Sequence, residues 1–143
     1  MANTDTVNAI TDNLHAALQG QGIKFSRKIF EDEKSIPASL IPLGEIFYRG
    51  EGFEHTHGQR PGYAEIDYLI RVILNVRDHA DSMREGQMWV HKIREALTVA
   101  TLNTGDLAAM KYVSRVTADR VELENRGNHS FLNYRMRVRY REG

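Results

Sequence analysis

The sequence contains no cysteine, only three prolines and no long apolar run. The absence of cysteine excludes disulfide bonds, thiolate metal ligands and cysteine nucleophiles. No stretch approaches the roughly 18 consecutive apolar residues that a membrane-spanning helix needs. The first residues, MANTDTVNAITDNL, lack the basic region and the apolar block of a signal peptide. We therefore expect a soluble protein that works, or is assembled, in a cytoplasm.

The sequence also lacks the motifs of several enzyme classes and an excess of either charge. It has no G-x-S-x-G nucleophile elbow, no G-x-x-x-x-G-K-[ST] phosphate loop and no G-x-G-x-x-G fingerprint. Nineteen basic and nineteen acidic residues give a net charge of 0. Residues 31–67 nevertheless carry eight acids against three bases, and residues 126–143 carry five arginines against one acid. A neutral chain with oppositely charged regions tends to associate, including with itself.

A long alternating segment dominates the middle of the sequence. Within residues 64–76 every second position is apolar, from Ala64 through Ile70 to Val76. This period of two predicts a strand with one buried face, and its length predicts neighbouring strands on both sides. Leu69 and Ile73, on the opposite face, indicate that part of that face is also covered.

Two helices are expected from apolar residues at helical spacing. The first covers residues 4–19. The second contains Trp89 on its apolar stripe and ends near residue 103. We expect Asp81 or Ser82 to cap its start, because residues 82–85, SMRE, match a capping box in which the glutamate returns to the backbone of the cap.

Further strands complete the expected fold, which forms one domain over residues 1–143. In residues 112–124 the apolar phase switches between Ala118 and Val121, which predicts a β-bulge. Residues 31–42 read as a loop. The strands are expected over residues 24–30, 43–54, 112–124 and the C-terminal segment. The sequence thus predicts an α+β fold, with a mostly antiparallel sheet of four to five strands, two helices on one face and a long β-hairpin.

Residues 53–62, FEHTHGQRPG, raise the question of a metal site. His55 and His57 could present two imidazoles from one side of an extended chain, with Glu54 or His79 as a further ligand. The surrounding glycines and proline are more typical of a long, solvated hairpin loop. We interpret the segment as a loop that holds no metal and contacts a partner. The candidate contact residues are Gly52, Phe53, His55, His57, Gln59 and Arg60.

Four arginines alternate along the last predicted strand and project from one of its faces over about 20 Å. They are Arg135, Arg137, Arg139 and Arg141, and we call them the arginine ladder. Three interpretations stay open. The ladder could form a salt-bridge surface between subunits, or it could face phosphate groups. It could also pair across strands, either with Glu122 and Glu124 or with Glu65 and Asp67. No nucleic-acid recognition motif accompanies it.

The order of these elements resembles the tail terminator proteins, also called tail completion or neck proteins, of long-tailed bacteriophages. The resemblance lies in DTVNAITDNLHAAL, IPLGEIFYRGEGFEH, YAEIDYLIRVILNVRD, SMREGQMWVHKIREALT and NYRMRVRYRE, and spans nearly the whole chain. It implies a ring of six copies that caps the tail tube and stops its polymerisation. The head side of such a ring meets a connector or stopper protein.

The resemblance further implies a protein of the virion neck that is assembled in the host cytoplasm. It implies contact with DNA only during passage through the channel, and no membrane, cofactor or catalytic residue. Two other classes stay open. One is a small metal-dependent or acid–base enzyme that uses His55, His57 and nearby acids. The other is a ligand-binding regulatory module of ferredoxin-like type, whose glycine-rich loop at a helix N-terminus is not found in the sequence.

Overall fold

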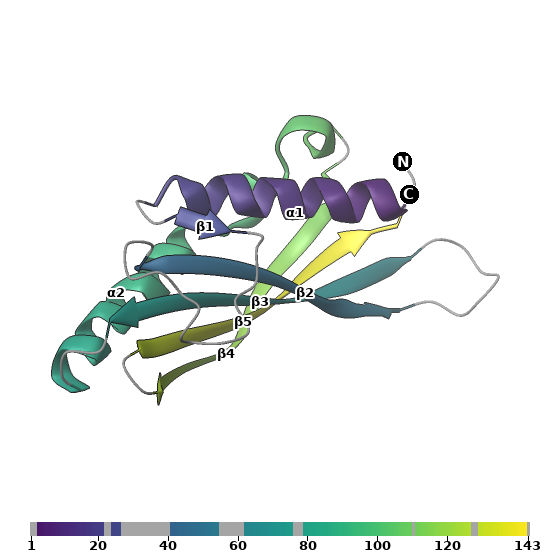
Figure 1. The fold of residues 1–143 in the computed structure, drawn as a ribbon. Coiled ribbons are helices and arrows are strands. Elements are labelled where there is room, and N and C mark those ends of the chain that lie inside the picture. The colour runs from purple at the N-terminus through teal and green to yellow at the C-terminus, as the bar shows by residue number, and fades with distance from the viewer. Residues whose placement is uncertain are drawn as a thin grey trace.

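A computed structural model describes residues 3–21, 24–26, 41–54, 62–75, 79–109, 111–126 and 129–142. Within these residues five strands form one sheet, along which helix α1 runs (Figure 1). The elements in chain order are α1 (Asn3–Gln19), β1 (Lys24–Ser26), β2 (Leu43–Phe53), β3 (Tyr63–Asn75), α2 (His79–Ala96), α3 (Val99–Leu102), the 3-10 turn η3 (Gly105–Leu107), β4 (Val113–Arg126) and β5 (His129–Arg141).

The sheet has the strand order β1-β2-β3-β5-β4, so the long strand β3 lies at its centre. The short strand β1 is parallel to β2, and all other neighbouring strands are antiparallel. The predicted α+β fold with a mostly antiparallel sheet is therefore confirmed. The strand expected over residues 24–30 is described only as far as residue 26, and residues 31–40 of the expected loop lie outside the described part of the chain.

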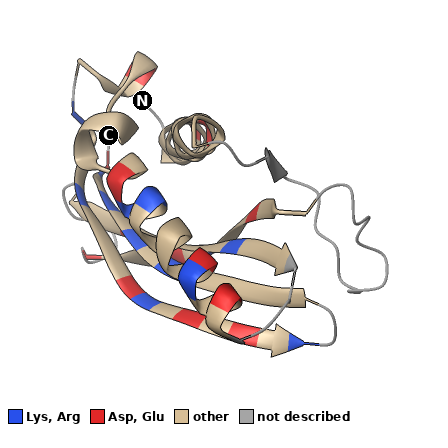
Figure 2. Cartoon of the chain, turned by 90° about the vertical axis from the view of Figure 1, so that its left-hand side faces the viewer, with Lys and Arg blue, Asp and Glu red and all other residues tan. Residues whose placement is uncertain are grey.

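Both main helices pack on one face of the sheet. The apolar side chains of β3 that alternate along that face are fully or almost fully buried, Ile70 and Val72 among them. They share one core cluster with Leu14 of α1 and with Trp89 and Ile93 of α2. This arrangement confirms the predicted buried face. The opposite face, which we call the outer face, carries charged side chains of both signs, among them Asp67, Arg137 and Asp119. Bands of both charges mark the strands in Figure 2.

β5 shows the cleanest alternation in the sheet. Tyr134, Met136 and Val138 are at most 3% exposed, whereas Arg135 and Arg137 between them are exposed. The bulge predicted in the fourth strand is present, because the pairing of β4 with β5 shifts between Ala118 and Arg120. A bulge adds one residue to one strand of a pair, so both halves of β4 keep their apolar positions toward the core.

The predicted start and end of the second helix are wrong. α2 begins at His79, so Ser82 lies inside the helix rather than at its cap. The Ser82 side chain is buried, and its Oγ accepts a hydrogen bond from Ser130 Oγ at 3.2 Å. The helix ends at Ala96, and Thr98 then caps the separate short helix α3 by accepting a bond from the Thr101 backbone N–H. This second cap explains why the helical pattern continued toward residue 103.

Candidate functional site

The predicted contact loop is only partly within the described residues. Gly52 and Phe53 belong to the end of β2, where they pair with Glu65 and Ala64 of β3. Phe53 is 59% exposed. His55, His57, Gln59 and Arg60 lie outside the described residues, so the loop hypothesis stays a prediction for them. Among the residues that are described, no group of three His, Cys, Asp or Glu side chains could hold a metal ion.

The base of this hairpin is joined to β5 by an ion pair. Arg139 donates to the Glu54 carboxylate through Nε at 3.0 Å and through Nη2 at 2.9 Å. Its guanidinium also lies 3.8 Å from the ring centroid of Tyr63. The hydrogen bond from Arg139 holds the pKa of Glu54 below its ordinary value. Arg139 thus fixes the position where the hairpin leaves the sheet.

The structure distinguishes between the two sets of cross-strand partners expected for the arginine ladder. Arg137 lies opposite Asp67, and its Nε is 3.2 Å from that carboxylate and 2.8 Å from Asp119 of β4. Pairing with the acids of β3 is therefore confirmed for Arg137. Glu122 and Glu124 instead form ion pairs with arginines of their own strand, at 2.7 and 2.8 Å.

The two remaining ladder residues have different surroundings. The guanidinium of Arg141 lies 5.7 Å from the ring centroid of Tyr112. Arg135 lies opposite Leu69 on one side and opposite Arg120 on the other. Arg135 forms no ion pair with any other residue that the structure describes. The four ladder positions therefore differ in how much of their charge is already neutralised within the chain.

On the helix-covered side, a hydrogen-bond network is centred on Glu51. Its carboxylate accepts bonds from the hydroxyl groups of Tyr48 and Tyr140, both at 2.7 Å. The bond to Glu51 is the main cause that raises the pKa of Tyr48 to about 12. Burial is the main cause that raises the pKa of Tyr140. The sequence patterns did not predict this network, although the tyrosines and the acid occupy inward positions of their strands.

A groove lies beside this network, between the first turns of α1 and the second half of β2. It has a volume of about 530 Å³. Tyr48, 53% exposed, and Phe53 contribute aromatic surface from β2, and Val7 contributes apolar surface from α1. The groove combines exposed rings with the Glu51 carboxylate, so it offers both apolar and hydrogen-bonding contacts.

A buried ion pair occupies the other end of β2. Arg71 of β3 donates through Nε to the Glu45 carboxylate at 2.8 Å and makes a second bond through Nη2. Glu45 is fully buried. The Arg71 guanidinium also lies 5.3 Å from the ring centroid of Phe47 and 5.2 Å from that of Phe131. This cluster covers part of the outer face, as the apolar residues Leu69 and Ile73 indicated.

Taken together, these groups support recognition through ion pairs, hydrogen bonds and aromatic contacts. In the described part of the chain, no helix is long and apolar enough to cross a bilayer. Comparison of the chain with protein-family models and with curated proteins finds no match.

Proposed function

We propose that this chain is a structural virion protein of the tail terminator type. In this proposal, copies of the chain form a ring on the end of a phage tail tube, stop its polymerisation and present a surface to a head-side connector or stopper protein. The ring number of six comes from the family resemblance alone. The protein would be assembled in the host cytoplasm and would meet DNA only as it passes through the channel.

The observation that carries the proposal is the division of the sheet into two unlike faces. Both helices cover one face, and the other carries exposed charges of both signs, including Arg135 and Arg137. A broad charged face is better suited to repeated contacts between subunits than to catalysis, which usually takes place in a pocket. The element order on which the resemblance rests is also the order in the chain, although a fold by itself does not determine a function.

The test measures assembly by the purified chain. Light scattering across concentration should give a mass well above the 16.4 kDa monomer, and electron microscopy should show rings. If ladder residues pair between subunits, assembly should weaken as salt shortens the Debye length below about 8 Å. If they line the channel instead, assembly should resist salt, and isolated rings should bind DNA in a salt-dependent way. We favour the subunit contact, because a strongly attractive lining would slow a passing polyanion.

A charge-reversed pair of variants makes the test specific. Arg137→Glu/Arg139→Glu should reduce assembly, whereas Arg120→Glu/Arg126→Glu on β4 changes the net charge equally and should have less effect. Thermal unfolding must first show that both variants fold. A chain that stays monomeric at high concentration and at every salt level, and that also fails to bind the ends of purified tail tubes, would contradict the proposal.

A further inference from the structure

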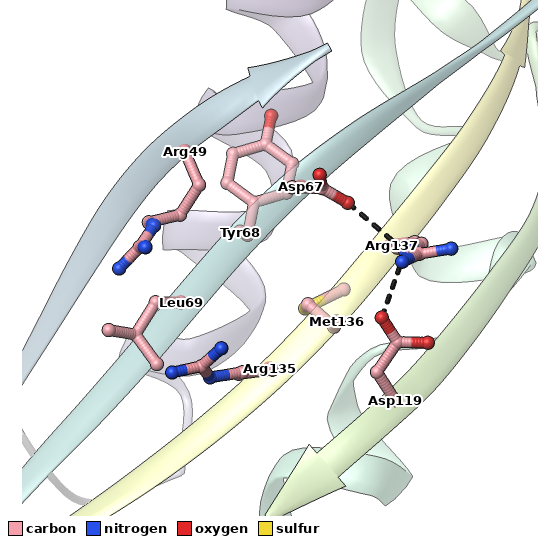
Figure 3. Close-up of a pocket in the computed structure, with 8 residues that line it drawn as sticks. All are labelled: Arg49, Asp67, Tyr68, Leu69, Asp119, Arg135, Met136 and Arg137. Carbon is pink, nitrogen blue, oxygen red and sulfur yellow. Dashed lines mark ion pairs between the residues drawn. The ribbon is translucent and has the colours of Figure 1, made fainter. Parts of the chain in front are cut away.

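The outer face contains a small hollow between β2 and β4. Its volume is about 210 Å³. Tyr68 and Met136 line it although their side chains belong to the core on the other side of the sheet, so its floor is the backbone of these two residues. The side chains around this floor are Arg49, Asp67, Leu69, Asp119, Arg135 and Arg137 (Figure 3). These side chains come from all four antiparallel strands.

Two β-bulges shape the rim of the hollow. Arg49 is the extra residue of β2, because Tyr48 pairs with Tyr68 whereas Gly50 pairs with Asp67. Asp119 is the extra residue of β4, because the pairing shifts between Ala118 and Arg120. Tyr68 and Met136 belong to a row of residues paired across four strands, with Tyr48 at one end and Ala118 at the other. Both bulges lie next to this row. Bulges redirect side chains and are frequent beside functional sites, so two bulges next to one hollow indicate a site.

The charges around the hollow do not cancel. Arg137 lies between Asp67 and Asp119, as the dashed lines in Figure 3 show, at 3.2 and 2.8 Å. Arg49 and Arg135 form no ion pair within the described part of the chain. Their side chains extend toward the Leu69 side of the hollow. Three guanidinium groups and two carboxylates leave one net positive charge.

We propose that this hollow binds a single carboxylate, the side chain of a glutamate or aspartate presented by a partner protein. Arg49 and Arg135 would donate charge-assisted hydrogen bonds to it. A planar guanidinium binds a carboxylate best in a two-pronged geometry, through two parallel N–H donors. Leu69 would contact the aliphatic part of the acidic side chain. The proposal concerns the hollow alone, and it holds whether or not the chain forms a ring.

Charge and size both favour an acidic side chain over nucleic acid. A polyanion that reached Arg49 and Arg135 would also meet the carboxylates of Asp67 and Asp119, which are 52% and 38% exposed. One net positive charge matches one carboxylate. The volume is also below the roughly 300 Å³ at which ordinary small-molecule pockets begin, so the hollow is sized for a side chain.

The experiment titrates the full chain with a short, end-blocked peptide that contains one glutamate. The readout is the NMR signal of the arginine Nε–H groups, assigned through single Arg→Gln substitutions. The Arg49 and Arg135 signals should shift and saturate, with a dissociation constant on the order of millimolar. The same peptide with glutamine in place of glutamate should produce no saturable shift. A short oligothymidylate serves as the nucleic-acid probe and should bind more weakly.

Matched variants identify the site. Binding by the variants is followed through the Arg137 Nε–H and Leu69 methyl signals, because the substitutions remove the Arg49 and Arg135 signals themselves. Arg49→Gln/Arg135→Gln should weaken binding by about tenfold or more, because each charge-assisted bond is worth roughly that factor. Arg115→Gln/Arg126→Gln removes the same charge from β4 residues that do not line the hollow, and should leave binding unchanged. If the first variant does not fold, Arg49→Lys/Arg135→Lys replaces it. That variant keeps the charge but loses the two-pronged geometry, so it should still weaken binding.

Three results would overturn the proposal. The first is the absence of a saturable shift with the glutamate peptide. The second is an equal loss of binding in both charge-matched variants, which would show attraction to net charge alone. The third is tighter binding of oligothymidylate than of the peptide at Arg49 and Arg135, which would assign the hollow to a nucleic-acid backbone.

Discussion

The carboxylate of Glu45 is fully buried and accepts two hydrogen bonds from the guanidinium of Arg71. Arg71 retains 18% of its side-chain exposure and lies between two phenylalanine rings. Removing one partner of a buried pair leaves the other charge uncompensated, and this costs more than the pair itself contributes.

We therefore predict that Glu45→Ala lowers the free energy of unfolding by about 3 kcal/mol. The apolar double variant Glu45→Leu/Arg71→Met should recover most of this loss. Urea unfolding monitored by circular dichroism measures both effects. Glu122→Ala, which breaks the exposed pair with Arg120, is the control and should cost less than about 1 kcal/mol. Equal losses in Glu45→Ala and Glu122→Ala would contradict the prediction.

Gly50 should be harder to replace than Gly52 of the same strand. Its φ of 130° lies in a region that side chains of L-residues rarely adopt. A Cβ at this position would meet no atom within 4 Å, so the cost of Gly50→Ala is backbone strain alone, about 1–3 kcal/mol. Gly52 is the matched control, because it also has open space but no positive φ. Gly52→Ala should stay within about 0.5 kcal/mol of wild type, or stabilise the fold slightly. Thermal or urea unfolding compares them, and equal effects would argue against strain.

The buried tyrosines should make the fold sensitive to alkali. Burial raises the pKa of Tyr68 and of Tyr140 above the ordinary value of 10.0. Below that pH both the folded and the unfolded chain keep these protons. Above it the unfolded chain releases them first, so stability falls as pH rises through 10 and beyond.

The titration of Tyr68 should lower the free energy of unfolding by an amount that approaches about 1.4 kcal/mol per pH unit. Urea unfolding at about pH 9 and about pH 11 measures it, and Tyr68→Phe should flatten the decline. This variant also loses the hydrogen bond with Thr11 at 2.7 Å, so the slope rather than the absolute stability is compared. An unchanged slope in Tyr68→Phe would show that this tyrosine does not titrate as inferred.

His55 and His57 should hold no structural metal. They lie in a glycine-rich segment, and a metal site needs further ligands from elsewhere in the chain. We expect no stoichiometric zinc after dialysis, and an unchanged melting temperature in His55→Ala/His57→Ala. Metal analysis by mass spectrometry tests the first expectation. Zinc that survives dialysis in wild type, but not in the double variant, would establish a site.

Hydrophobic periodicity predicted the parts of the fold in which burial alone decides which way each side chain points. The alternation of residues 64–76 identified the central strand because every second side chain faces the core. The phase switch after Ala118 located a bulge for the same reason. The bulge at Arg49 left no such signal, since Gly50 has no side chain to mark a face.

The candidate site was less predictable because it depends on strand neighbours. Which acids face the arginine ladder follows from β5 lying between β3 and β4, and the sequence leaves that order open. The capping prediction at Ser82 failed for a related reason. Serine suits a helix cap, but here it bonds to Ser130 of a strand distant in the chain.

At the two bulges the outer face can gain or lose a residue without a change in the residues of the core. Gly50 pairs with Asp67 and Tyr48 with Tyr68, so a chain without Arg49 would show uninterrupted alternation and keep the same residues turned inward. β4 without Asp119 would likewise alternate without a break from Arg115 to Arg126, because Ala118 and Arg120 would become neighbours. A single-residue insertion or deletion usually moves every following side chain of a strand to the opposite face of the sheet. At these two bulges it would not. Related chains could therefore gain or lose a charge at this rim, and so change partners, without repacking the interior.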